Sequence, residues 1–281
     1  MSRRAQRTLL LAFTYVFLIG VVVLTLWPIA WTLSTSFKTT GDLFATPPQW
    51  IPLRPTLQPY LQLFAPGNPF ATWYRNSAIV GLFTVLLGLL LAVFAGYALS
   101  RFKFRGSSAI MLFILSSQMF PVVLLLIAIY IIFRDLDQLN KLTGLVLAYM
   151  AFALPFSVWM MKGYIDTIPT EMEEAALIDG CTRLQVLFKI TLPLLAPAVV
   201  SVGVFNFLVA WSELMFALTL NTSDATRTFP PGLIIRYAGQ YQSLYNEMMA
   251  GSMLVTLPVI LIFIFLQRYV VEGMTLGAVK G

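Results

Sequence analysis

Long apolar segments alternate with shorter polar stretches along almost the whole chain of 281 residues. A helix needs about 20 mainly apolar residues to cross the hydrocarbon core of a bilayer. Six segments reach that length, with expected bounds near 8–33, 76–100, 108–133, 142–161, 193–220 and 247–271. The pattern therefore predicts an all-α membrane protein with six transmembrane helices.

The composition agrees with a chain that crosses the bilayer several times. Hydrophobic residues make up 59% of the chain and charged residues 11%, whereas a soluble domain carries about 25% charged residues. The net charge of +6 is compatible with nucleic-acid binding, but the basic residues are spread over the loops and form no single run or face. We therefore expect no nucleic-acid partner, and we interpret the positive charge as an orientation signal.

The basic residues predict which side of the membrane each loop faces, because cytoplasmic loops carry an excess of Lys and Arg. With six alternating spans, one side collects Arg3, Arg4, Arg7, Arg101, Lys103, Arg105, Lys162, Arg183, Lys189, Arg268 and Lys280. The other side holds Lys38, Arg54, Arg75, Arg134, Lys141, Arg227 and Arg236, several of them offset by aspartates. We expect both termini and the loop after the fourth span to be cytoplasmic.

The chain is expected to divide at about residue 75. Residues 1–75 contain the first span and a proline-rich external loop, whose aromatic residues favour partial order at the membrane surface over a floppy linker. The first apolar run continues through Trp27 to Leu33, past the length of a signal-peptide core, which favours a retained anchor. Residues 76–281 then form a core of five spans.

The sequence lacks the residues that most enzymes and metal sites use. It contains no histidine and one cysteine, Cys181, so the usual zinc ligands and the usual base near neutral pH are missing. No GxxxxGK[ST] phosphate-binding pattern occurs. We expect no catalytic residues, no metal and no cofactor in this chain, and any ATP must be bound by another chain.

The loop at 167–192, together with Pro193, combines charge, small residues and helix-end signals. Thr170 is expected to cap a short helix, with Glu173 completing a capping box. Gly180 is expected to end that helix in a left-handed conformation, and Thr182 with Gln185 repeats the box. One interpretation of the pattern is an amphipathic linker at the lipid surface.

The spacing of this loop points to a second interpretation. Glu174-Ala175-Ala176 is followed by Gly180, Ile190 and Leu192-Pro193, which resembles the EAA loop of ATP-binding-cassette importer permeases. The resemblance implies a coupling helix that docks in a cleft of the ATPase subunit. The residues it assigns to coupling are Glu174, Ala175, Ala176, Asp179, Gly180, Ile190, Leu192 and Pro193.

The resemblance extends over nearly the whole chain, to the MalG-like permeases of sugar importers. It rests on the residues 97–101, Pro155-Phe156, the Trp211 region, Leu257-Pro258 and the ending Gly277 to Gly281. It implies the type I ABC importer permease fold in a bacterial or archaeal cytoplasmic membrane. It also implies four kinds of partner: a second, MalF-like permease, two ATPase subunits that hold ATP and Mg, an external solute-binding protein, and membrane lipid. The cargo would be maltose or maltodextrin, trehalose or a related oligosaccharide.

Four residues are candidates for the substrate pathway: Gln118, Asn206, Trp211 and Glu213. Polar side chains at membrane depth should face protein or water, and Asn206 and Glu213 fall on one face of the fifth span together with Gly203. Aromatic rings and hydrogen-bonding groups suit a sugar. Helix–helix packing and a polar interface with the partner permease stay open, and the resemblance implies that much of the sugar site belongs to the other permease.

The loop between the fifth and sixth spans is polar, aromatic and expected to be external. Its candidates for docking the binding protein are Arg227, Arg236, Tyr237, Gln240 and Tyr241. An ordinary connector is the alternative. Two other functions also stay open: a permease for glycerol phosphate or another cargo, and an ion-coupled carrier. The carrier is disfavoured because Glu213 is its only buried ionisable candidate and no inverted repeat is visible.

Overall fold

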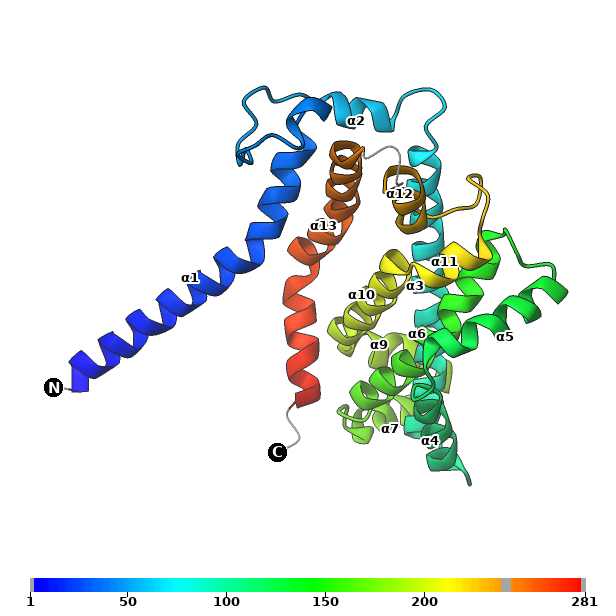
Figure 1. The fold of residues 1–281 in the computed structure, drawn as a ribbon. Coiled ribbons are helices and arrows are strands. Elements are labelled where there is room, and N and C mark those ends of the chain that lie inside the picture. Colours follow the sequence, from blue (N-terminus) through cyan, green and yellow to red (C-terminus); the bar gives the residue numbers. More distant parts are fainter. Residues whose placement is uncertain (1–2, 239–243, 279–281) are drawn as a thin grey trace. The chain divides into compact units, whose positions relative to one another are not determined.

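The computed structural model describes residues 3–238 and 244–278, and its regular elements there are helices (Figure 1). The elements are α1 (Arg3–Ser36), η1 (Thr40–Asp42), α2 (Gln58–Leu63), α3 (Phe70–Arg101), α4 (Ser107–Ser117), α5 (Val122–Asp135), α6 (Leu142–Ile165), α7 (Thr170–Ile178), α8 (Arg183–Val186), the π-helical η2 (Leu187–Thr191), α9 (Leu192–Leu194), α10 (Ala196–Ser212), α11 (Met215–Leu220), α12 (Phe229–Tyr237) and α13 (Tyr245–Ala278). The all-α prediction is confirmed.

The apolar helices of the described residues agree with a six-span chain. Four segments are each long and apolar enough to cross a membrane: Leu10–Ser36, Phe70–Arg101, Leu142–Ile165 and Tyr245–Tyr269. Two bent pairs also qualify, Ser107–Ser117 with Val122–Asp135 at 97° and Arg183–Leu194 with Ala196–Ser212 at 83°. The total is six when each bent pair counts as one broken span.

The third predicted span is broken at its proline. Pro121 precedes α5 with a non-helical ψ of 121°, and it has no N–H to continue the hydrogen bonds of α4. A proline inside an apolar run favours a kink, but a bend as large as 97° between α4 and α5 is a finding of the structure.

The fifth predicted span, 193–220, is not one helix, and that prediction is wrong. Helix α10 ends at Ser212, Glu213 is extended with ψ of 130°, and α11 starts at Met215. The carboxylate of Glu213 accepts hydrogen bonds from the backbone N–H groups of Phe216 at 2.9 Å and Ala217 at 3.0 Å. Because these are orphan donors of the new helix, Glu213 caps α11 instead of continuing the face of α10.

The chain forms two compact units by its internal contacts. One unit contains Met1–Phe70 and Leu233–Thr256, and the other contains Ala71–Gly232 and Leu257–Gly281. In the first unit, Trp50 packs against Trp27 and Trp31 with ring centres 4.5 and 4.7 Å away, and Ser36 hydrogen-bonds the Tyr60 hydroxyl at 2.8 Å. These contacts order the proline-rich loop beside the end of α1.

The second unit is built around α6, which packs against α4, α10 and α11. One buried cluster joins α3, α6 and α10, with Ala92, Met161 and Ala198 fully buried in it. Helix α3 approaches α6 closely because Gly96 has no side chain: a β-carbon there would lie 3.0 Å from the backbone nitrogen of Lys162. The small residue Gly96 therefore serves close helix packing.

Candidate coupling site and transport pathway

Helix α7 carries the EAA-like residues, and its start differs from the prediction. The residue before the helix is Pro169, no side chain caps it, and Thr170 is already the first helical residue. The predicted capping box between Thr170 and Glu173 is therefore wrong. Its physical reason is that the Glu173 carboxylate is buried and bonded to other helices.

The end of α7 confirms the prediction of a left-handed glycine. Gly180 has φ of +89°, its N–H donates to the Leu177 carbonyl at 3.1 Å, and the N–H of Cys181 donates to the Ala176 carbonyl at 3.0 Å. This pair of bonds is a Schellman motif, which satisfies the last free carbonyls of a helix. The second capping box is also confirmed, with Thr182 and Gln185 bonded reciprocally at the start of α8.

Glu173 is the centre of a buried polar cluster beneath α7. Its side chain is 2% exposed, and Arg101 Nε lies 2.8 Å from Oε1. The Tyr97 hydroxyl donates to Oε2 at 3.0 Å, and the Thr191 hydroxyl donates to Oε1 at 3.2 Å. Three donors from two distant segments thus satisfy one carboxylate, which is the condition for keeping a buried charge stable.

Arg101 extends this cluster to the end of α6. Its Nη2 donates to the carbonyl oxygens of Ile165 and Ile168, both at 2.9 Å. Ile165 is the last residue of α6 and Ile168 lies just beyond it. Backbone carbonyls at a helix end lack helical partners. Next to it, the Ser100 hydroxyl donates to Asp166 at 2.6 Å, and Lys162 pairs with Asp166 at 2.7 Å. The last turn of α3 is therefore bonded both to α7 and to the end of α6.

The π-helical segment η2 presents Thr191 to this cluster. Leu187 and Thr191 are buried while Phe188 and Lys189 between them are exposed. Pro193, in the first turn of α9, lacks the N–H with which a continuing α-helix would bond. Single π turns inside helices are rare and are often found at functional sites.

The structure divides the eight residues that the resemblance assigned to coupling. Glu174, Ala175, Asp179, Gly180 and Pro193 are exposed, Ile190 and Leu192 are half-buried, and Ala176 is buried. Two exposed apolar residues of α7 escaped the sequence reading, Met172 and Ile178, the latter 86% exposed. The sequence feature that could have identified them is the presence of two large apolar side chains on a short, acidic helix. We call the exposed side chains of Met172, Glu174, Ala175, Ile178 and Asp179 the coupling face.

The four pathway candidates lie in different surroundings. Gln118 is exposed at the end of α4 and donates to the Phe152 carbonyl at 3.2 Å. Asn206 is fully buried and accepts from the Ser157 hydroxyl of α6 at 2.7 Å. Trp211 is buried among aromatic rings, and Glu213 caps α11. The contacts of Asn206 and Glu213 are those of helix packing and helix capping.

An apolar cavity of about 450 Å³ lies beside Trp211. Its walls come from α3, α10 and the second half of α13, and include Tyr74, Val85, Phe207, Trp211, Pro258 and Ile262. Aliphatic and aromatic groups dominate these walls. Since sugar sites combine rings with several placed hydrogen-bonding groups, the lining suits an acyl chain or an apolar helix better than a sugar.

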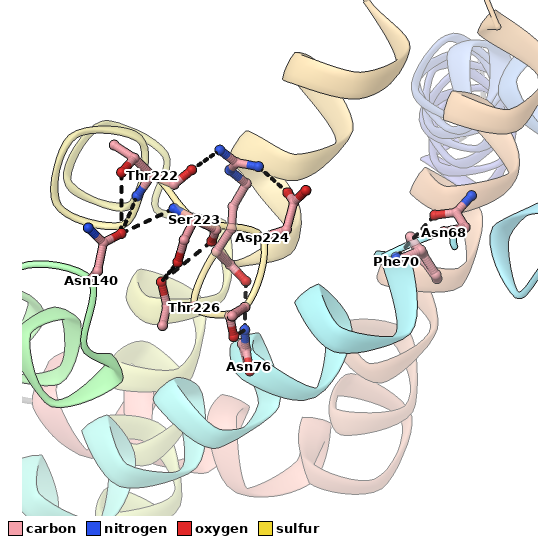
Figure 2. A network of polar contacts seen from close by, with 10 residues as sticks. Asn68, Phe70, Asn76, Asn140, Thr222, Ser223, Asp224 and Thr226 are labelled. Atoms are coloured by element: carbon pink, nitrogen blue, oxygen red, sulfur yellow. Dashed lines mark hydrogen bonds and ion pairs between the residues drawn. The ribbon is translucent and has the colours of Figure 1, made fainter. Parts of the chain in front are cut away.

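The loop at 221–228 is tightly ordered by two asparagines (Figure 2). Asn140 Oδ1 accepts from the backbone N–H groups of Thr222 at 2.8 Å and Ser223 at 3.1 Å. Asn76 Nδ2 donates to the carbonyls of Ala225 and Arg227, both at 2.9 Å. Helix α3 and the α5–α6 connection therefore hold this loop in one shape.

The binding-protein docking candidates are also separated by their surroundings. The Arg227 guanidinium pairs with Asp224 and donates to the Thr222 carbonyl, and its side chain is 12% exposed. Arg236 is exposed, whereas Tyr237 is buried and accepts from Asn68 Nδ2 at 2.8 Å. Burial raises the pKa of the Tyr237 phenol. Gln240 and Tyr241 lie outside the described residues.

Comparisons with known proteins place this arrangement in a family. The profile of the "binding-protein-dependent transport system inner membrane component" matches residues 85–276. The diacetylchitobiose uptake permease DasC of Streptomyces coelicolor is 36% identical over 95% of this chain and 94% of its own. GanQ of Bacillus subtilis, a galactooligosaccharide transport permease, is 33% identical over 99% and 98%, and the trehalose/maltose permease MalG of Thermococcus litoralis is 31% identical over 93% and 94%.

A solved structure shows the same fold. A chain of a bacterial ABC transporter that imports alginate superposes with a TM-score of 0.78 at 23% identity, covering 96% of this chain and 98% of that one. A chain of the MetNI methionine ABC transporter gives a TM-score of 0.55 at 19% identity, covering 77% and 98%. Both are chains of ABC transporters, and the predicted type I importer permease fold is confirmed. The chain belongs to the family of binding-protein-dependent transport system inner membrane components, the non-catalytic permease subunits of ABC importers.

Proposed function

We propose that this permease imports an oligosaccharide. It forms half of the translocation pathway, a MalF-like permease forms the other half, and both termini lie in the cytoplasm. Two ATPase subunits bind ATP and Mg, and an external solute-binding protein delivers the sugar. Residues 76–281 are the transporting core in this proposal, and residues 1–75 are an N-terminal extension with the first span.

The sugar class is supported by the names of three relatives. DasC, GanQ and MalG are described as permeases for diacetylchitobiose, galactooligosaccharides and trehalose/maltose. These cargoes are all carbohydrates of two or more units, but they differ from one another. The oligosaccharide class therefore carries over as the proposal, with the particular sugar set by the binding protein and the partner permease.

One observation carries the coupling role: α7 combines an exposed coupling face with a buried anchor. The coupling face includes Glu174, Ala175 and Ile178, while Glu173 on the same helix is 2% exposed and bonded to α3. A helix that is only a surface linker needs no buried ion pair to hold it. This arrangement is what a force-bearing contact with another subunit requires.

The mechanism follows from these contacts. Closure of the ATPase dimer on ATP moves α7, and the helices bonded to it follow as the pathway opens outward. The external binding protein releases its sugar into the opened pathway, and hydrolysis resets the complex. Gln118 is proposed to line the pathway, with Trp211, Asn206 and Glu213 supporting it from the helix interfaces. The ordered loop at 221–228 and the exposed Arg236 are proposed to meet the binding protein.

The test is transport by the reconstituted complex. A tagged copy of the chain is purified with its partners from native membranes and placed in proteoliposomes with labelled diacetylchitobiose, trehalose, maltose and galactobiose. We expect uptake of at least one sugar that requires ATP and the binding protein. Uptake by this chain without an ATPase would establish the ion-coupled carrier instead, and uptake of glycerol phosphate alone would overturn the sugar class.

The orientation has its own test in the single cysteine. Cys181 follows α7 and is half-buried. A membrane-impermeant maleimide is expected to label it in inside-out vesicles and not in right-side-out vesicles. Labelling from the outside only would contradict the proposed topology.

A further inference from the structure

A connection between α7 and the core runs through side chains and does not follow the chain. Helix α7 follows α6 directly, and through α8, η2 and α9 it leads into α10. Helix α3 is different, because Arg101 and Glu173 are 72 positions apart. Their ion pair, together with the Tyr97 hydroxyl bond to Glu173, is therefore a direct side-chain link between α3 and α7.

This link is directional as well as buried. The carboxylate of Glu173 accepts from Arg101, Tyr97 and Thr191, and the same guanidinium donates to the carbonyls of Ile165 and Ile168. Hydrophobic contact would allow α7 to slide along α3 at little cost. The buried carboxylate resists such sliding, because moving away from its donors would leave an unpaired ion in an apolar environment.

We propose that Glu173 and Arg101 are positioning residues that join α7 to α3, so that the two helix ends move as one body when the ATPase subunits pull on α7. This inference rests on the proposed import function. In it, α3 receives the movement through the ion pair, and α10 receives it through the chain. The coupling face makes the contact with the ATPase, and the buried side of the same helix passes the movement on.

The first experiment measures transport per ATP in the reconstituted complex. Glu173→Gln keeps the size of the side chain and removes its charge. Glu171→Gln is the matched control, because Glu171 is an exposed glutamate in the first turn of the same helix. We expect Glu173→Gln to assemble and hydrolyse ATP while sugar uptake per ATP falls at least about fivefold, the lower end of coupling between sites. The control variant is expected to match the wild type.

The outcomes separate this inference from the proposed function. If the wild-type complex shows no ATP-dependent uptake, the proposed function fails. If the wild type transports and Glu173→Gln assembles with unchanged uptake per ATP, the proposed transmission from α7 to α3 is wrong, and the ion pair has a structural role only.

A second measurement leaves the ion pair intact, so it does not depend on whether Glu173→Gln folds and assembles. Spin labels are placed on the native Cys181, which is bonded to the end of α7, and on Lys103→Cys, exposed just after α3. The proposal expects the same label-to-label distance without nucleotide and with ATP. A label-to-label distance distribution that shifts or broadens when ATP binds would show that α7 moves relative to α3, and it would overturn the proposal.

Discussion

The side-chain amide of Asn206 on α10 occupies the space that a β-carbon at Gly88 on α3 would need. A β-carbon built at Gly88 would lie 2.5 Å from Asn206 Nδ2, while the Oδ1 of the same amide accepts from Ser157 on α6. The amide therefore lies where three helices meet, and glycine is the residue that lets α3 come close enough.

Gly88→Ala is expected to destabilise the chain by about 1–3 kcal/mol, the usual cost of overpacking a dense interior. The matched control is Gly163→Ala on α6, where an added β-carbon meets nothing within 4 Å. There the replacement should be neutral or stabilising, because alanine is the better helix former. Thermal unfolding of the purified chain in detergent, followed by fluorescence, compares the two. Equal midpoints for both variants would contradict this account of Asn206.

Arg101→Ala is expected to cost about 3–5 kcal/mol, because it leaves the Glu173 carboxylate buried without its counter-ion. The comparison is Lys141→Ala, which breaks an ion pair with Asp137 at 2.5 Å whose side chains are 45% and 92% exposed. Exposed pairs of this kind contribute little, since water and salt screen them. The same unfolding measurement should show a large loss for Arg101→Ala and no resolved change for Lys141→Ala. Similar effects from both variants would show that Glu173 does not need Arg101.

Gly180→Val should weaken transport and ATP hydrolysis together. An added β-carbon at Gly180 meets nothing within 4 Å, and its φ is +89°, so the penalty of about 1–2 kcal/mol comes from the left-handed backbone alone. Gly180→Asn should be milder, because asparagine tolerates that conformation. The measurement is sugar uptake and binding-protein-stimulated ATP hydrolysis in proteoliposomes. If the valine variant keeps both activities, the end of α7 has no part in coupling.

Asn140→Ala should loosen the loop at 221–228. The change removes the acceptor for Thr222 and Ser223 and strains a backbone with φ of +55°. Asn140→Asp keeps the acceptor oxygens and tolerates the same backbone, so it is the matched control. Amide hydrogen exchange at 222 and 223 is expected to speed up in the alanine variant only. Fast exchange at these amides in the wild type would contradict the ordered loop.

Local signals in the sequence predicted much of this protein. Apolar runs located the helices, and Gly180 and the pair Thr182 and Gln185 located helix ends. These features depend on a residue and its near neighbours, which is why they could be read in order along the chain. A prediction from near neighbours was wrong at Thr170, where Glu173 completes no capping box because its carboxylate bonds to α3 instead.

The sequence by itself determined that the chain is helical, apolar and built to lie in a membrane, and it located the loop that resembles the EAA loop. Only the tertiary structure decided that Glu173 meets Arg101, that Asn206 fills the space above Gly88 and that Glu213 ends one helix and caps the next. The physical reason is that helix formation and burial in lipid follow from local composition. Hydrogen bonds between residues 72 or 76 positions apart depend on which helices pack together and in which register.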